Sequence, residues 1–269
     1  MEDLVAYFDG SFMKKSEIKL DIDNLGFTRG YGAYECFRTY GRKPFRLYDH
    51  VERLKRTCKS LLINFPEENL YEISDELIDK NPGSDLIFRL YVIDSNLDKP
   101  YHLVVLCNTS EHFKYSNPTH PLAIKSALDT RSNIGVKSTN YATTLIEVKK
   151  AKALGFDDVL FIGEDQLVHE LARANIVGIK DQTLITPKSH LLAGITRLTL
   201  LEIAKDYDFE MKEEDLNLES LLNMEEVFAC ATIRGISPIR QIDETHFTSC
   251  KKTEILKSYF TNLSSLALT

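Results

Sequence analysis

The sequence has 269 residues, 43% of them hydrophobic and 27% charged, and its formal net charge is −7. Length and composition are those of a globular protein with one large domain or two modest ones, able to bury a sizeable core. A net negative charge favours neither nucleic acid nor an anionic membrane as a partner, and we predict neither.

Five cysteines are scattered along the chain without a C-x-x-C pair. Isolated cysteines in odd number indicate neither a disulfide framework nor a zinc site, so we predict reduced thiols and no metal. The amino-terminal residues are acidic where a signal peptide is positively charged. No apolar run approaches the roughly 20 residues of a membrane-spanning helix. These features predict a cytoplasmic protein.

The first part of the chain alternates strand and helix signals. Apolar residues spaced three and four apart after Asp49 predict a helix with Asp49 as its N-cap. In chain order we predict two short strands around a turn at Asp9-Gly10, a hairpin within residues 36–48, a helix from Asp49, a second helix near Glu68–Lys80, and buried strands within residues 85–94 and 101–110.

The segment EHFKYSNPTHP is the best linker candidate, because it holds two prolines among mixed polar residues. After it we predict a strand at 122–128, a helix over Leu145–Leu154, strands within 157–163, 176–180 and 183–187, helices over Gly194–Lys205 and Leu216–Asn223, a strand within 226–235 and a closing helix near Lys251–Leu263. The fold class is therefore mixed α/β, or α+β: a small N-terminal domain (1–112), a linker (113–120) and a larger β-rich C-terminal domain with peripheral helices (121–269).

Several candidate functional residues follow in order after the linker. Lys137 lies between Val136 and small polar residues, Glu170 lies in the weakly polar run LVHELA, and Thr196 opens a helix after Gly194. Each alone is most simply a structural or surface residue. Together they match a phosphorylated pyridine cofactor, which needs a lysine for its aldehyde and a carboxylate that keeps its ring nitrogen protonated.

The phosphate of such a cofactor needs its own donors. Free N–H groups at a helix N-terminus, here those of Ile195 and Thr196, bind phosphate well. Thr232, which leaves an apolar strand into a turn, can add a hydroxyl and an N–H. An arginine would add a bidentate charge, but spacing alone does not select which one.

With these elements the chain resembles the class IV, or fold-type IV, pyridoxal 5'-phosphate (PLP)-dependent aminotransferases. That family includes branched-chain aminotransferase, D-amino acid aminotransferase and 4-amino-4-deoxychorismate lyase. The resemblance rests on an ordered set of motifs: F-D-G, G-Y-G-A-Y-E, H-x-x-R-L, K-S-T-N-Y, G-F-D-D-V-L-F, H-E-L-A-R-A-N-I, G-I-T-R-L and T-I-R-G-I-S-P-I-R. It implies a two-domain enzyme, a homodimer, and an active site at the domain interface.

The resemblance also implies roles for individual residues. Lys137 becomes the Schiff-base and proton-transfer lysine, Glu170 the partner of the pyridine nitrogen, and Tyr141 the donor to the phenolic oxygen of the cofactor. It further implies that the phosphate ligands are Arg53, Ile195, Thr196 and Thr232.

The candidate substrate residues are Tyr34, Arg38, Phe88 and Arg89, although Arg38 suits a structural ion pair equally well. Tyr34-Glu35 resembles the transaminases, whereas the lyases typically have Thr at position 35. We therefore expect an aminotransferase acting on a small amino acid and a keto acid, with branched-chain substrates and 2-oxoglutarate favoured.

Other functions stay open at this point. Aminodeoxychorismate lyase, releasing p-aminobenzoate and pyruvate, is the runner-up, and D-amino acid aminotransferase is a further alternative. A relative that binds PLP without turnover would need neither Lys137 nor Glu170, so the presence of both residues argues against that alternative. A plain α/β interaction protein would leave the ordered motifs unexplained.

Overall fold

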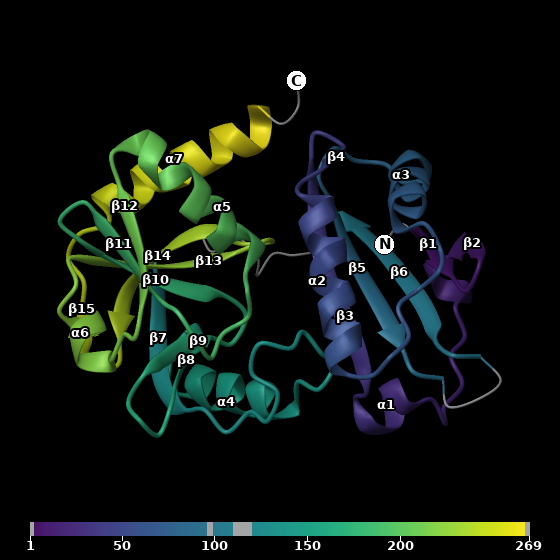
Figure 1. Cartoon of the computed structure of the whole chain (residues 1–269), viewed down its shortest axis with the longest axis horizontal. Coiled ribbons are helices and arrows are strands. Elements are labelled where there is room, and N and C mark those ends of the chain that lie inside the picture. The colour runs from purple at the N-terminus through teal and green to yellow at the C-terminus, as the bar shows by residue number, and fades with distance from the viewer. Residues whose placement is uncertain (1–2, 96–98, 110–119, 267–269) are drawn as a thin grey trace. The chain divides into compact units, whose positions relative to one another are not determined.

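The computed structural model describes residues 3–95, 99–109 and 120–266. The chain forms two compact units (Figure 1). One is built on a six-stranded sheet and includes the later segment Val136–Tyr141, and the other is built on a nine-stranded sheet. The predicted linker 113–120 lies, except for its last residue, outside the described residues. The proposed domain boundaries stay a prediction.

The sheet of the first unit is antiparallel throughout, in the order β2-β1-β6-β5-β3-β4. Its strands are β1 (Val5–Phe8), β2 (Ser11–Lys14), β3 (Gly32–Tyr40), β4 (Lys43–Pro44), β5 (Leu86–Ile93) and β6 (His102–Thr109). The turn between β1 and β2 has positive φ angles at Asp9 and Gly10, as a tight hairpin requires. The predicted strands and hairpins of this region are confirmed.

Three α-helices and a 3-10 turn complete the first unit: η1 (Lys15–Glu17), α1 (Leu25–Arg29), α2 (Leu47–Ser60) and α3 (Leu70–Lys80). The prediction that Asp49 is the N-cap of α2 is wrong. The helix begins two residues earlier, after Arg46, whose φ of 52° is left-handed. Asp49 lies in the first turn and accepts a hydrogen bond from Arg46 Nε at 2.6 Å, where its charge also suits the helix dipole.

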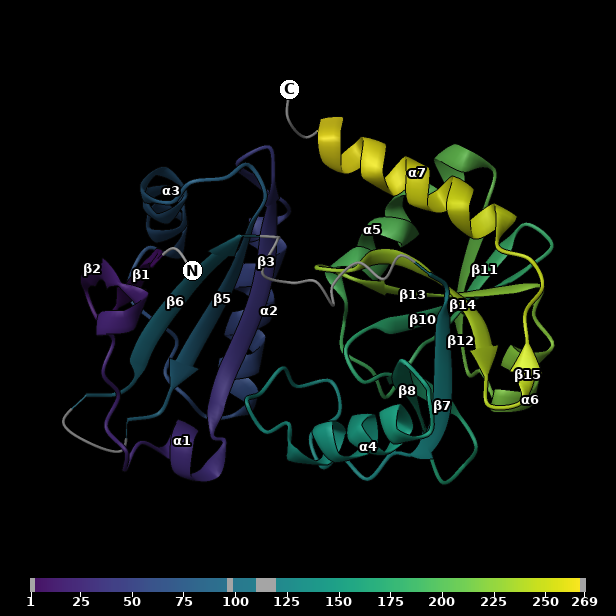
Figure 2. The same ribbon diagram turned by 180° about the vertical axis from the view of Figure 1, so that it is seen from behind.

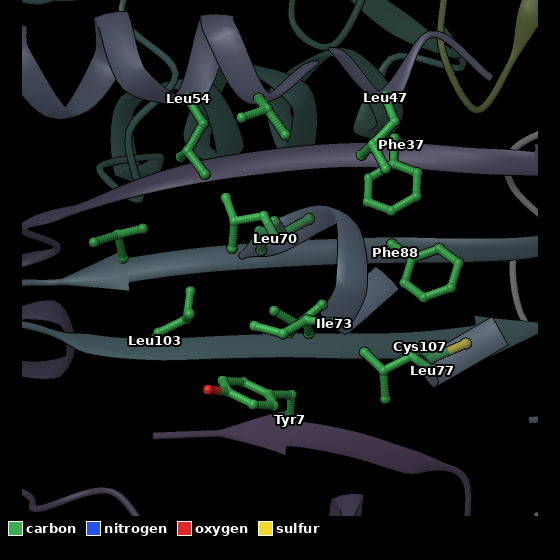
Figure 3. Close-up of a cluster of buried hydrophobic side chains, with 14 of the residues drawn as sticks. Tyr7, Phe37, Leu47, Leu54, Leu70, Ile73, Leu77, Phe88, Leu103 and Cys107 are labelled. Carbon is green, nitrogen blue, oxygen red and sulfur yellow. The ribbon is translucent and has the colours of Figure 1, made fainter. Parts of the chain in front are cut away.

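Helices α2 and α3 supply the side chains that bury one face of this sheet (Figure 3). Phe37 on β3 pairs with Phe88 on β5, and their rings stack with centroids 4.6 Å apart. Because side chains alternate along a strand, Glu35 lies on the same face as Phe37, whereas Tyr34 and its neighbours two residues apart lie on the opposite face. The sheet therefore has a helix-covered core face and a second face that is available to carry function.

The second unit has a mixed sheet in the order β12-β11-β10-β13-β14-β7-β8-β9, with β15 paired to β14. Its strands are β7 (Leu122–Leu128), β8 (Asp158–Ile162), β9 (Val168–Leu171), β10 (Asn175–Lys180), β11 (Thr183–Pro187), β12 (Glu210–Glu214), β13 (Glu226–Ala231), β14 (Gly235–Ile242) and β15 (Thr245–His246). The sequence did not reveal β12, β14 or β15. Strand β14 pairs parallel to β7, more than a hundred residues away, and that pairing leaves no local signal.

The helices of the second unit are α4 (Ala142–Ala153), α5 (Ile195–Ile203), α6 (Leu218–Leu222) and α7 (Lys251–Leu266), with a 3-10 turn, η3 (Ala204–Tyr207), after α5. Figure 2 shows α4 beside β7 and β8, where Val148 and Ala151 pack against Val159 and Phe161. The predicted helices are all present. Helix α4 begins three residues before the predicted Leu145.

Candidate active site

Lys137 is held by backbone pairing to the beginning of β3. The Tyr34 N–H donates to the Lys137 carbonyl at 2.9 Å, and the Thr139 N–H donates to the Gly32 carbonyl at 2.9 Å. Ser138 between them forms a β-bridge with Ala33. The Lys137 Nζ lies 4.5 Å from the centroid of the Tyr34 ring. A partly exposed lysine on a backbone fixed from both sides has the rigidity that covalent catalysis needs.

The face of the sheet that carries Tyr34 also carries Arg89 and Tyr91. Tyr34 pairs with Tyr91 across the two strands and Cys36 pairs with Arg89. The Tyr34 and Tyr91 rings stack with centroids 5.3 Å apart. Burial raises the pKa of the Tyr34 hydroxyl well above its usual value, although Arg89 opposes that shift. The Lys137 amine thus lies over the Tyr34 ring, on the sheet face that also carries Tyr91 and the Arg89 guanidinium.

Sequence reasoning missed Tyr91. It lies two residues after Arg89 on β5, so strand alternation alone would have put the two side chains on one face.

Two of the proposed substrate residues, Phe88 and Arg38, have structural partners in the first unit. Phe88 is 0% exposed and fills the core against Phe37, so we leave it out of the candidate site. Arg38 lies on the same face as Tyr34 but forms an ion pair with Asp85 at 3.8 Å, and its guanidinium stacks over the Tyr40 ring at 4.3 Å. Arg38 thus forms the structural ion pair considered in the sequence analysis, and a role in substrate binding stays a prediction.

Arg53 forms a buried cluster with Glu35 and His50. Its Nε and Nη2 donate to the two oxygens of Glu35 at 2.8 and 2.7 Å, and His50 Nδ1 lies 3.1 Å from Oε1. Burial alone would raise the pKa of the Glu35 carboxyl, but Arg53 and His50 hold that pKa far below its usual value. Burial lowers the pKa of His50 despite the carboxylate. The Nε–Nη2 edge of Arg53 is therefore committed to Glu35, and a phosphate would need the other edge.

Glu170 on β9 is the centre of a second network, in the second unit. Arg131 Nη1 donates to its Oε1 at 3.1 Å. The Leu192 N–H and Asn175 Nδ2 donate to its Oε2 at 3.1 and 3.3 Å. The side chain of Glu170 is 9% exposed. A carboxylate held from three directions is fixed in position, as a partner for a ring nitrogen must be.

The N-terminus of α5 is tied to the same network. Gly194 is its N-cap and makes no side-chain cap, so the first N–H groups of the helix lack that partner. A Cβ at Gly194 would lie 1.9 Å from Asn175 Oδ1, so only glycine fits there. Asn175 thus connects Glu170 to Gly194, which directly precedes Ile195 and Thr196, the residues that we proposed as phosphate ligands.

Thr232 and Tyr141 complete the predicted set. Thr232 directly follows β13, the strand against which α5 packs, and is partly exposed. Tyr141 closes the segment Val136–Tyr141 of the first unit and lies close enough to Tyr34 to raise the pKa of its hydroxyl. The roles of these residues stay predictions.

The residues present fit a phosphorylated pyridine. The second unit brings the Glu170 carboxylate, through Asn175, to a helix N-terminus that has no side-chain cap, and only glycine fits at that N-cap. The carboxylate suits a protonated ring nitrogen, and the helix N-terminus suits a phosphate. In the first unit, Lys137 provides an amine on a fixed backbone. Among the described residues no group of three His, Cys, Asp or Glu side chains could hold a metal ion.

Comparison with known proteins gives the family directly. Residues 32–242 match the family model described as amino-transferase class IV. The chain belongs to the class IV aminotransferases. The sequence-based identification of the family, of its α+β fold and of a PLP-dependent enzyme class is thus confirmed.

Relatives of this class IV aminotransferase carry several names. One of Methanocaldococcus jannaschii, named as a branched-chain-amino-acid aminotransferase, is 28% identical and covers 93% of this chain and 92% of its own. The aminodeoxychorismate lyase of Bacillus subtilis is 28% identical over 91% of this chain and 89% of its own. The D-alanine aminotransferase of Staphylococcus aureus is 26% identical over 88% of each.

A solved structure shares the fold of this class IV aminotransferase. A protein of Mycobacterium tuberculosis, described as a hypothetical aminotransferase and solved in a PLP-bound form, superposes with a TM-score of 0.86 at 15% identity, over 98% of this chain and 100% of the other. In the described parts of the chain, no helix is long and apolar enough to cross a membrane. The predicted homodimer and cytoplasmic location stay predictions.

Proposed function

We propose that this class IV aminotransferase transfers the amino group of a branched-chain amino acid to 2-oxoglutarate, with PLP bound covalently to Lys137. The observation that carries the substrate class is the face built by Tyr34, Tyr91 and Arg89 next to Lys137. Two aromatic rings suit an apolar side chain, and a guanidinium suits a substrate carboxylate. The relative named as a branched-chain-amino-acid aminotransferase supports the same class.

Each residue of the candidate site has a defined task in this proposal. The Glu170 carboxylate would accept a hydrogen bond from the protonated ring nitrogen, and the Tyr141 hydroxyl would donate one to the phenolic oxygen. The phosphate binds to the first N–H groups of α5 at Ile195 and Thr196, to Thr232 and to the edge of Arg53 that faces away from Glu35. When bound, PLP supplies an aldehyde for the substrate amine and a ring that accepts electrons from Cα. The Lys137 amine would hold and move the proton that is transferred during the reaction.

Cofactor attachment is the first test. The purified protein should be yellow, and borohydride reduction followed by peptide mapping should find the cofactor on Lys137. Attachment to another lysine would overturn the assignment of Lys137.

A half-reaction screen tests the substrate. We expect L-leucine, L-isoleucine or L-valine to convert the bound cofactor to its pyridoxamine form, and 2-oxoglutarate to restore it. Arg89→Ala should raise KM for the keto acid more than it lowers kcat, because Arg89 is proposed to bind the carboxylate in the ground state and the transition state alike.

The lyase is the second candidate, and the relative from Bacillus subtilis favours it. In the same screen, aminodeoxychorismate would then release p-aminobenzoate and pyruvate, while every branched-chain amino acid would leave the spectrum unchanged. Conversion with D-alanine alone would instead indicate a D-amino acid aminotransferase.

A further inference from the structure

Glu170 is held by an arginine that is itself held by a second carboxylate. Asp129, just after β7, accepts hydrogen bonds from Arg131 Nε at 2.9 Å and from Nη2 at 2.7 Å. The remaining nitrogen of Arg131, Nη1, reaches Glu170. The guanidinium also lies over the Phe161 ring, 4.2 Å from its centroid. Asp129 thus fixes the whole plane of the guanidinium and aims one nitrogen at Glu170.

A histidine also contacts Asp129, on the oxygen that binds Arg131. His169 Nδ1 lies 2.9 Å from Asp129 Oδ2, the oxygen that also accepts from Arg131 Nη2. Burial alone would raise the pKa of the Asp129 carboxyl, but hydrogen bonds from Arg131 and His169 lower it. Asp129 is therefore ionised and can only accept, so His169 carries a proton on Nδ1 and donates it.

The orientation of the His169 ring is also fixed. His190 stacks on it with centroids 4.9 Å apart and an interplanar angle of 25°. His169 and His190 lie near Lys188 and Asp215, which form an ion pair at 2.7 Å. His169 is therefore a buried residue, 6% exposed, and its one described hydrogen bond is directed at Asp129.

We propose that Asp129 and His169 are positioning residues for Glu170: His169 holds Asp129, Asp129 holds Arg131, and Arg131 holds the Glu170 carboxylate against the cofactor ring. This proposal rests on the proposed function, in which Glu170 is the partner of the ring nitrogen. None of the three supporting side chains needs to touch the substrate. Their effect should be seen in the state of the ring and in kcat, with little effect on KM.

The variants of His169 separate hydrogen bonding from packing. His169→Asn keeps an N–H near the position of Nδ1, whereas His169→Phe keeps a ring to stack on His190 and loses the donor. Asp129→Asn removes the charge that holds Arg131. His246→Phe, on the exposed strand β15 of the same unit, is the matched control.

The readout is the 15N NMR signal of PLP labelled at its ring nitrogen, measured on the full-length holoenzyme, together with kcat and KM for leucine. We expect His169→Phe to shift the signal toward that of an unprotonated ring and to lower kcat about 5- to 10-fold, the effect of one hydrogen bond, with KM nearly unchanged. His169→Asn and His246→Phe should resemble the wild type. Asp129→Asn should change both readouts further.

The outcomes distinguish this proposal from the proposed function. If Glu170→Gln moves the ring signal but His169→Phe and Asp129→Asn do not, the positioning role is overturned and the function stands. If the wild-type protein binds no labelled PLP, or Glu170→Gln leaves the signal in place, the proposed partner of the ring is wrong and this proposal falls with it. Should His169→Phe fail to fold, Asp129→Asn provides the same decision.

Discussion

Two buried carboxylates of this chain, Glu35 and Glu170, both bind an arginine, but their surroundings differ. Glu35 takes two hydrogen bonds from Arg53, so the charges of that pair cancel. Glu170 takes one from Arg131, whose other edge belongs to Asp129. The Asp129, Arg131 and Glu170 side chains therefore sum to one net negative charge.

That difference shows how a carboxylate–arginine pair can serve either structure or cofactor binding. A neutral, doubly bonded pair such as Glu35–Arg53 satisfies a buried charge and anchors a helix to a sheet. A network with excess negative charge can stabilise a further cation, and a protonated pyridine ring is such a cation. Glu35 is thus suited to hold structure and Glu170 to hold the cofactor ring.

The largest expected loss of activity is that of the Lys137 variant. Lys137→Ala should keep the fold and lower kcat by at least about 10³-fold, because both the covalent link and the proton carrier are removed. Stopped-flow half-reactions with leucine would measure it. Turnover within 10-fold of the wild type would show that another group carries the proton.

Glu170→Gln should give the next largest loss of activity. We expect kcat to fall about 10²- to 10³-fold while PLP stays bound, because an amide does not stabilise a charged ring as a carboxylate does. Steady-state kinetics and the visible spectrum test this together. A loss confined to KM would mean that Glu170 acts on substrate binding instead.

Glu35→Gln should have the opposite profile, with stability as its main effect. Removing one partner of a buried ion pair leaves Arg53 uncompensated and should cost about 3–5 kcal/mol in the free energy of unfolding. Denaturant titration of the apoprotein measures it. If Glu35→Gln were as stable as the wild type yet lost PLP, the role of Glu35 would be to orient Arg53 for the phosphate and not to stabilise the fold.

Acid should lower the stability of the cluster formed by Glu35, His50 and Arg53. The pKa of Glu35 in the folded protein lies below the 4.5 of the unfolded chain, so its stabilisation is complete above about pH 4.5 and is lost as pH falls below that value. The pKa of His50 is also lowered, from 6.5. The stabilisation that neutral His50 contributes is therefore also lost as pH falls, and the loss begins near pH 6.5.

The free energy of unfolding should therefore fall with a slope approaching about 1.4 kcal/mol per pH unit for each group. Urea titrations of the apoprotein between pH 7 and 3 would measure this slope. Glu35→Gln should flatten it below about pH 4.5, whereas an unchanged slope in that variant would place the acid sensitivity elsewhere.

The smallest expected effect concerns the edge of Arg53 that does not bind Glu35. Arg53→Lys keeps the charge but cannot bind Glu35 and a phosphate with separate edges. We expect weaker retention of PLP on dialysis, with activity restored by excess cofactor. Full retention in Arg53→Lys would show that the N-terminus of α5 suffices for the phosphate.

The sequence by itself determined the family and most of the local structure. Alternation and turn residues predicted β1, β2, β5 and β6, and helical spacing predicted α2 and α3. Ordered motifs selected Lys137, Glu170 and the glycine that begins α5. These signals are local, because a motif or a period is complete within a few residues of chain.

Only the tertiary structure decided which side chains meet. It placed Phe88 in the core, Tyr91 beside Tyr34, and Arg131 between Asp129 and Glu170. Asp129 directly follows strand β7 and Glu170 lies on β9, and these two strands lie on either side of β8 in the sheet. The reason is physical: strand order and register set which distant residues become neighbours, and those follow from the packing of the whole sheet, which no segment of the sequence specifies alone.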